Sequence, residues 1–137
     1  MNYTQLYSDL YHYSAYRGLQ INGWFLEDQL ISSTCHLTLW QSDTETLVMV
    51  TELAANEGMS VTNAAGWLAT KVIQDYQLSP ERTRFVEHYG KMSYANSDIV
   101  DTYDLVTFSW NEEGEACNPK WRRLTKEEVT ALPSQAV

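Results

Sequence analysis

The feature that most constrains the fold is a stripe of apolar residues between positions 61 and 76. Its members recur at the i, i+3, i+4, i+7 spacing of one helix face. They are Val61, Ala64, Ala65, Leu68, Ala69, Val72, Ile73 and Tyr76. Gly58, followed by Ser60 or Thr62 as N-cap, marks the start, and Leu78-Ser79-Pro80 marks the end. Because alanine side chains are small, this face can approach a sheet closely, so we expect the helix to lie across one.

Strand-like segments lie on both sides of this helix. Residues 35–40 alternate in polarity and residues 46–52 are rich in β-branched side chains, so the two segments predict a hairpin. Residues 83–89 and 103–110 predict two further strands, with the long connection 90–102 between them. We expect a short piece at residues 121–124 to extend the same sheet.

Helices are predicted near both ends of the chain. In residues 3–16, one face of a helix would carry Tyr3, Leu6, Tyr7, Leu10, Tyr11 and Ser14. This spacing predicts an amphipathic N-terminal helix over residues 1–17. Asn22-Gly23 then predicts a tight hairpin, because both residues tolerate positive φ. Thr125 and Glu128 fit a capping box, which predicts a short C-terminal helix over residues 125–133.

The order of these elements predicts a single α+β domain over residues 1–137. We expect two layers, with a mostly antiparallel sheet of about four to six strands and helices packed on one face. The chain lacks the repeated βαβ pattern of a parallel nucleotide-binding sheet. A composition that is 44% hydrophobic and 12% aromatic is too apolar for a disordered protein.

Charge disfavours direct binding to nucleic acid or to an anionic membrane. The net charge is −9, and no Lys or Arg lies between Arg17 and Lys71. The basic cluster Lys120-Trp121-Arg122-Arg123 stands beside several glutamates and would make a weak phosphate site. The sequence shows no secretory signal and no apolar run long enough to span a membrane. With two distant cysteines, Cys35 and Cys117, we expect a reduced cytoplasmic protein, although a bridge between the two stays open.

Catalytic candidates gather around the stretch RFVEHYG, residues 84–90. It places Glu87 and His88 side by side, but neighbours in a strand point to opposite faces and cannot readily form a pair. A functional His88 would therefore need Asp101 or Asp104 as its partner. Cys35 and His36 are also neighbours in a predicted strand, so they would point to opposite faces and could not form a catalytic pair. No basic residue lies nearby to lower the pKa of the thiol.

No metal or cofactor site is expected. Asp98, Asp101 and Asp104 recur at intervals of three residues, which is not the spacing of a calcium-binding EF-hand loop. Glycine-rich phosphate loops, the nucleophile elbow of hydrolases and the His-Glu-x-x-His zinc motif are all missing from the sequence.

The aromatic content favours a binding function. Five tryptophans and nine tyrosines are present, and these residue types carry much of the energy of protein interfaces. We therefore predict a non-enzymatic module that binds another protein or associates with itself, with Tyr7, Tyr11 and Trp40 as contact residues. Its acidic half would steer a basic partner.

Two alternatives stay open at this stage. One is a small enzyme or small-molecule binder with a pocket near His88 and the 90–102 segment, using His88, Glu87, Asp101 or Asp104 as acid–base groups. The other is an acidic mimic of DNA that inhibits a nucleic-acid-binding protein.

Overall fold

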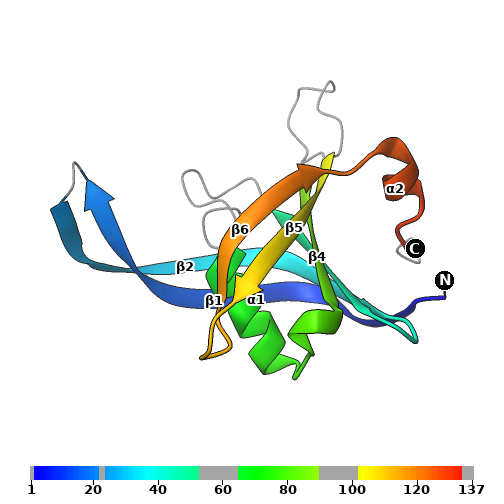
Figure 1. Ribbon diagram of the computed structural model, residues 1–137, viewed down its shortest axis with the longest axis horizontal. Helices are drawn as coiled ribbons and strands as arrows, with labels where there is room; N and C mark the ends of the chain where they lie inside the picture. Colours follow the sequence, from blue (N-terminus) through cyan, green and yellow to red (C-terminus); the bar gives the residue numbers. More distant parts are fainter. Residues whose placement is uncertain (1, 22–23, 53–64, 90–101, 134–137) are drawn as a thin grey trace.

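A computed structural model of the chain describes residues 2–21, 24–52, 65–89 and 102–133, with the backbone alone described for residues 14–21, 24–33, 52, 65 and 89. Strands make up most of these residues (Figure 1). In chain order the elements are β1 (Thr4–Ile21), β2 (Trp24–Gln41), β3 (Thr46–Glu52), α1 (Ala65–Asp75), the 3-10 helix η2 (Pro80–Arg82), β4 (Thr83–Tyr89), β5 (Thr102–Trp110), β6 (Ala116–Arg123) and α2 (Lys126–Thr130).

The six strands form one open, mixed sheet in which their spatial order repeats their order in the chain, from β1 to β6. β3 and β4 run parallel, and the other neighbouring pairs are antiparallel. A parallel pair needs a crossover connection, and α1 lies in the one between β3 and β4. A single βαβ unit therefore stands in the middle of the sheet.

The predicted fold class, a two-layer α+β domain with helices on one face of a mostly antiparallel sheet, is wrong. The sheet is mixed and dominates the structure, and the described α-helices are two short ones that lie against opposite faces. Leu68 and Val72 of α1 belong to the buried cluster on one face. Leu124 and Leu132, which flank α2, pack against a separate cluster on the other face.

The reason lies in the central strands. Leu47, Val48, Met49 and Val50 follow one another in β3, and all four are buried. Successive side chains of a strand point to opposite faces, so this run gives β3 two dry faces and requires a cover on each. A single helical layer could cover only one of them.

The predicted N-terminal helix is also wrong, because residues 4–21 form β1. The tyrosines at positions 3, 7 and 11 are four residues apart, a spacing that fits one face of a helix and one face of a strand equally well. Tyr11 and Tyr13 point into the core beside α1, whereas Leu6 and Leu10 are 53% and 47% exposed. This alternation has the period of a strand, and it agrees with the high strand propensity of tyrosine.

The other predicted elements are confirmed. β2 and β3 form the predicted hairpin, with Gln41 paired to Thr46. Ile21 pairs with Trp24 on either side of Asn22-Gly23, and those two residues lie outside the described part. β4 and β5 match the predicted strands, and β6 includes the 121–124 piece apart from its last residue.

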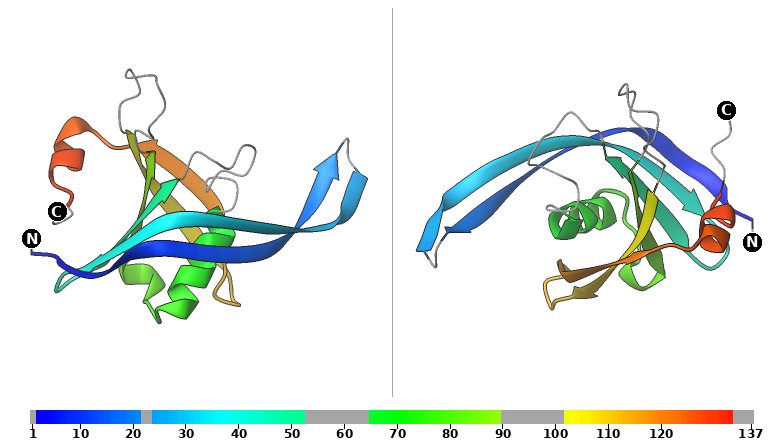
Figure 2. Two further views of the ribbon diagram at one scale, coloured as in Figure 1. Left: turned by 180° about the vertical axis from the view of Figure 1, so that it is seen from behind. Right: turned by 90° about the horizontal axis from the view of Figure 1, so that it is seen from above.

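The predicted central helix is present as α1, with Leu68, Ala69, Val72 and Ile73 buried as expected. Its proposed N-cap residues lie outside the described part of the chain. The sheet curves around α1, which lies between the β1–β2 pair and the β5–β6 pair (Figure 2). The contact with β6 is close: Thr70 Oγ1 accepts the N–H of Ala116 at 2.9 Å, and a Cβ on Gly66 would lie 3.1 Å from the Ala116 carbonyl oxygen.

The predicted capping box starts α2. Thr125 Oγ1 accepts the N–H of Glu128 at 3.2 Å, while Glu128 Oε1 accepts the N–H of Thr125 at 3.0 Å. Arg122 adds a bidentate pair to the same carboxylate, at 2.8 and 2.9 Å. The Arg122 hydrogen bonds, followed by that of Thr125, lower the pKa of Glu128 from 4.5 to about 2.

This arrangement predicts an acid-sensitive C-terminal segment. Because the folded-state pKa of Glu128 is lowered, its contribution to stability is fully present above about pH 4.5 and is lost as the pH falls towards 2. The difference in urea midpoint between wild type and Glu128→Gln should therefore be constant near neutral pH and shrink below pH 4.5. Glu127→Gln is the control for net charge. A difference between wild type and Glu128→Gln that does not change with pH would contradict this account.

Candidate functional site

The structure brings two of the predicted catalytic candidates together. Glu87 of β4 is in register with Asp104 of β5, and both side chains lie on the face that α1 covers. His88 lies on the opposite face, as the alternation of the strand predicted. Asp101, the remaining candidate, is outside the described residues.

Glu87 is a buried carboxylate on an apolar face. It is 2% exposed, and Trp121 Nε1–H of β6 donates a hydrogen bond to its Oε2 at 2.9 Å. A small cavity beside it is lined by apolar side chains on the α1 face, namely Val50, Leu68, Ala69, Phe85, Val106 and Phe108. Burial of a carboxylate is costly unless it is hydrogen-bonded, so the indole donor stabilises Glu87 in this position.

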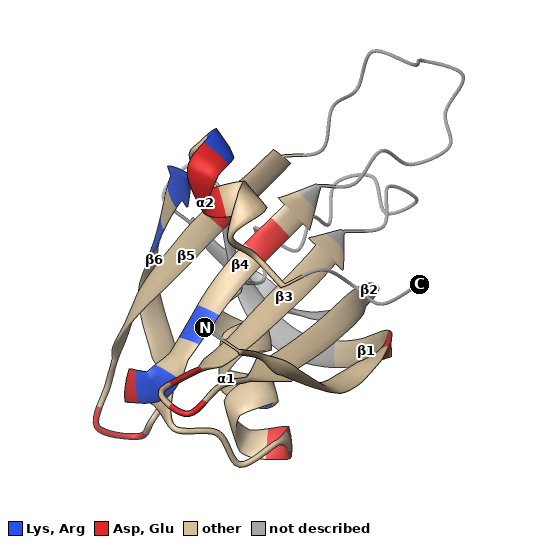
Figure 3. Cartoon of the chain, turned by 90° about the vertical axis from the view of Figure 1, so that its right-hand side faces the viewer, with Lys and Arg blue, Asp and Glu red and all other residues tan. Residues whose placement is uncertain are grey.

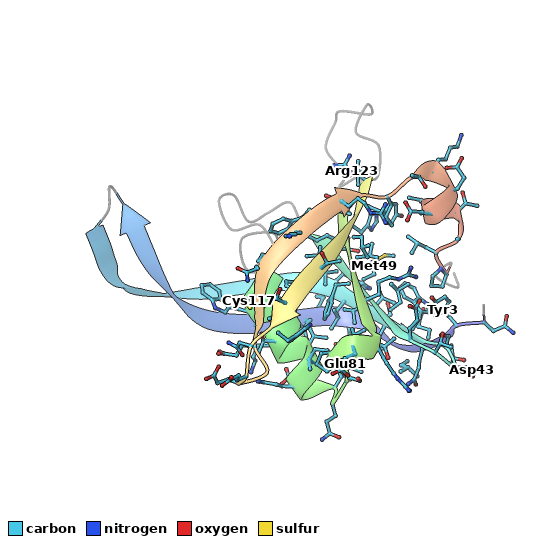
Figure 4. The ribbon with its side chains drawn as sticks, in the orientation of Figure 1. Tyr3, Asp43, Met49, Glu81, Cys117 and Arg123 are labelled. Atoms are coloured by element: carbon cyan, nitrogen blue, oxygen red, sulfur yellow. The ribbon has the colours of Figure 1, made fainter. Side chains whose placement is uncertain are left out.

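Asp104 is held in a different way. Arg123 Nε donates to its Oδ1 at 2.6 Å, and the Asp104 side chain is only 13% exposed. Arg123 and Trp121 lie two residues apart in β6, so they reach the same face of the sheet. Arg123 lies towards the end of β6 away from Cys117 (Figure 4).

Sequence reasoning missed Trp121 and Arg123 as partners of these carboxylates. They were visible only as part of the basic cluster 120–123, which the structure divides between two faces: Arg122 binds Glu128, and Arg123 binds Asp104. The side-chain period of two in a strand is the signal that could have placed Trp121 and Arg123 on one face. Nothing local indicated that β6 would lie beside β5.

A pair of carboxylates can serve general acid–base catalysis, but this pair lacks space for a substrate. The cavity beside Glu87 has a volume of about 20 Å³, which suits a single water molecule. Both carboxylates are already bonded to β6. Within the described residues the cluster therefore has the character of a structural link between β4, β5 and β6.

His88 has structural contacts. Its ring stacks on Tyr103 with the ring centres 4.3 Å apart and the planes 4° from parallel. Its Nδ1 lies 3.1 Å from Thr51 Oγ1 of β3. These contacts join β3, β4 and β5 on the face away from α1.

The remaining reactive groups are also separated from one another. Cys35 is fully buried, and burial raises the pKa of its thiol to about 12, which disfavours the nucleophilic thiolate. His36 Nε2 lies 2.9 Å from Ser8 Oγ, on the other face of β2. Cys35 and Cys117 are both free. In the described part of the chain, no group of three or more His, Cys, Asp or Glu is placed to hold a metal ion.

Two of the three predicted binding residues belong to a tyrosine seam between β1 and α1. Tyr7 packs on Tyr76 with ring centres 5.3 Å apart, and Tyr11 on Tyr76 at 6.3 Å. Tyr11 donates a hydrogen bond to Asp75 at the end of α1. Burial, together with this bond, raises the pKa of Tyr11. The seam thus fixes α1 against β1 within one chain.

Trp40, the third predicted binding residue, is 2% exposed and lies in the cluster on the α2 face with Leu47, Met49 and Val86. In the single chain its side chain is therefore part of the core.

The most prominent surface feature is a long hairpin. β1 and β2 each contain 18 residues, but β3 pairs only with residues 35–41 of β2. Among the described strands, residues 14–21 of β1 and 24–33 of β2 have only each other as neighbours. This distal ribbon projects from the rest of the sheet (Figures 1 and 2). Its eight β1 residues, at a rise of about 3.3 Å each, give it a length of about 26 Å.

Charged side chains are interspersed on the body. Figure 3 shows both acidic and basic segments on β4 and on α2, and basic segments on β6. Several acids are paired: Glu45 with Arg84 at 3.1 Å, Glu128 with Arg122 and Asp104 with Arg123. Tyr3 bonds Glu45 at the end of the sheet where Asp43 also lies (Figure 4). The charges of Glu45, Glu128 and Asp104 are therefore balanced by neighbouring arginines.

Comparison of the chain with protein-family models, curated proteins and solved structures finds no significant match. Neither of the α-helices that the structure describes is long and apolar enough to cross a membrane.

The Glu87–Trp121 bond can be measured with a double-mutant cycle. Trp121→Phe keeps an aromatic ring but removes the donor to a buried carboxylate, so we expect a loss of about 1–3 kcal/mol in the free energy of unfolding. In a Glu87→Met background, where no carboxylate remains, the same substitution should cost much less. Equal losses in both backgrounds, measured by urea denaturation, would show that Trp121 acts through packing alone.

The burial of Trp40 gives a second prediction. Trp40→Ala should lower the free energy of unfolding by about 3–5 kcal/mol, because it leaves a cavity in the α2-face cluster. Leu10→Ala, at a half-exposed position on β1, should cost less than about 1 kcal/mol. A Trp40→Ala protein as stable as wild type would contradict the packing described above.

Proposed function

We propose that the protein is a non-enzymatic interaction module and that the distal ribbon of β1 and β2 is the part that engages its protein partner. The observation that carries this proposal is the projection of the ribbon beyond the sheet. A two-stranded hairpin is at best marginally stable in water, and three or more strands or a packed face are needed for independent stability.

The sequence of the ribbon supports this role. Its apolar members are Ala15, Tyr16, Leu19, Ile21, Trp24, Phe25, Leu26, Leu30 and Ile31. Large apolar and aromatic residues of this kind are enriched at interfaces, so the composition of this hairpin supports contact with a partner. Tyr7, Tyr11 and Trp40 make contacts within one chain, so the proposal assigns the contact with the partner to the ribbon instead.

The enzyme alternative has less support. Its candidates Glu87 and His88 lie on opposite faces, and the cavity at Glu87 holds about one water molecule. If the partner is a different protein, the acidic character of the chain favours one with a basic surface, whose approach it would accelerate. We also propose a cytoplasmic location, which the two free cysteines support.

A shortened hairpin tests the role of the ribbon. Replacing residues 16–30 by Asn-Gly keeps the Ala15–Ile31 pair and closes it with a two-residue turn. Since no described core residue is removed, we expect an unfolding midpoint close to that of wild type. Tagged wild-type and shortened proteins would be incubated with host lysate at low and high salt, and the bound proteins identified by mass spectrometry.

The expected result is a stoichiometric partner that wild type retains and the shortened variant loses. The oligomeric mass of both proteins is measured in parallel, so that self-association is counted as well. Identical bound proteins and identical mass for the two folded proteins would overturn the proposal.

A further inference from the structure

The two edges of the sheet differ in their protection against pairing with another strand. β6 contains Pro119, which has no N–H, and Asn118 beside it has a φ of 52°. The pairing with β5 is irregular here, and Lys120 and Arg122 add charge to the same edge. Proline, bulges and positive charge are devices that prevent edge-to-edge association.

β1 lacks most of these devices. It contains no proline and no lysine, and its irregularities lie near its ends, which leaves residues 7–18 regular. Three large apolar side chains are exposed among those the structure describes, and two of them, Leu6 and Leu10, are on β1. A long, regular edge of this kind favours the addition of a strand.

The backbone at Leu10 shows which groups face this open edge. The N–H of Leu10 donates to Asp9 Oδ1 at 2.7 Å, and its carbonyl accepts the Tyr7 hydroxyl at 3.1 Å. Both backbone groups are therefore bonded to side chains of β1 and not to β2. Because the direction of these groups alternates along a strand, the other even-numbered residues of the regular stretch face the open edge as well.

We propose that β1 pairs antiparallel with β1 of a second copy of the chain, with the two-fold axis at Tyr13, so that two six-stranded sheets become one. This inference rests on the proposed role of the hairpin and names its partner. In this register position 10 lies opposite position 16 of the other copy, and position 12 lies opposite position 14. All four are even-numbered, so their backbone groups face one another across the interface.

The charged residues of β1 favour the register with the two-fold axis at Tyr13. β1 carries two ionised residues, Asp9 and Arg17, and a two-fold axis at Tyr13 places each opposite the other in the second copy. The axis also lies close to the middle of Thr4–Ile21, so almost the whole strand can pair. Although each chain has a net charge of −9, the two charges of β1 cancel, and the edge itself does not repel its copy.

The dimer would also supply the support that the ribbon lacks. Positions 14–21 of one copy would lie beside positions 5–12 of the other, which belong to its six-stranded body. Each two-stranded ribbon thereby becomes part of a wider sheet. The interface is isologous, as in most homodimers.

Charge reversal tests the register. Within one chain Asp9 pairs with Leu37 of β2, and Arg17 pairs with Gln29. Asp9 and Arg17 are eight residues apart on the same strand, so their side chains cannot contact each other within one chain. In the dimer, Asp9→Arg or Arg17→Asp alone creates two like-charged pairs and should weaken association at least about tenfold. The double variant Asp9→Arg/Arg17→Asp should restore the wild-type affinity. Affinities would be measured by sedimentation equilibrium, with urea unfolding as the check on folding.

Three results would overturn the inference: a wild-type protein with the mass of one chain at every concentration, a dimer that neither single reversal weakens, or a double variant without rescue. A monomer whose full hairpin still retains another protein would overturn this inference and leave the proposed function intact. A monomer whose shortened variant retains the same proteins as wild type would overturn both.

Discussion

Strands β3 and β4 carry apolar side chains at consecutive positions, so both of their faces must be kept from water. The chain meets this requirement by placing α1 on one face and the segment around α2 on the other. The α1 crossover between β3 and β4 allows these two strands to pair in parallel. Tyr11 and Thr70 then attach α1 to β1 and β6, and the sheet curves around the helix.

The two edge strands of this sheet, β1 and β6, differ in how they are bonded and covered. At the β6 side, Trp121 and Arg123 bond the carboxylates of Glu87 and Asp104, and the strand itself is irregular at Pro119. At the β1 side the strand is long and regular and continues into a ribbon with no third strand among the described residues. An additional strand would stabilise the sheet most at the β1 edge, where the ribbon has only two strands. The shape of the molecule is in this way linked to an interaction function.

Much of the fold could be predicted from local patterns. The capping box at Thr125, the apolar stripe of α1 and the hairpins at residues 22–23 and 41–46 are each specified by residues close together in the sequence. The opposite orientation of Glu87 and His88 followed from strand geometry alone. The tyrosines of residues 3–11 were misread because a four-residue spacing satisfies both helix and strand, and only the long pairing with β2 decides between them.

The sequence by itself determined the type and approximate position of most elements after residue 18, because turn residues, caps and periodicity act over a few neighbouring positions. Only the tertiary structure decided that Glu87 and Asp104 lie in register, that Trp121 reaches the former, and that Trp40 is part of the core. It also decided that β2 extends well beyond β3 and leaves a ribbon. These features depend on which distant strands become neighbours, and that choice is set by the burial of both faces of the whole sheet, which no local pattern encodes.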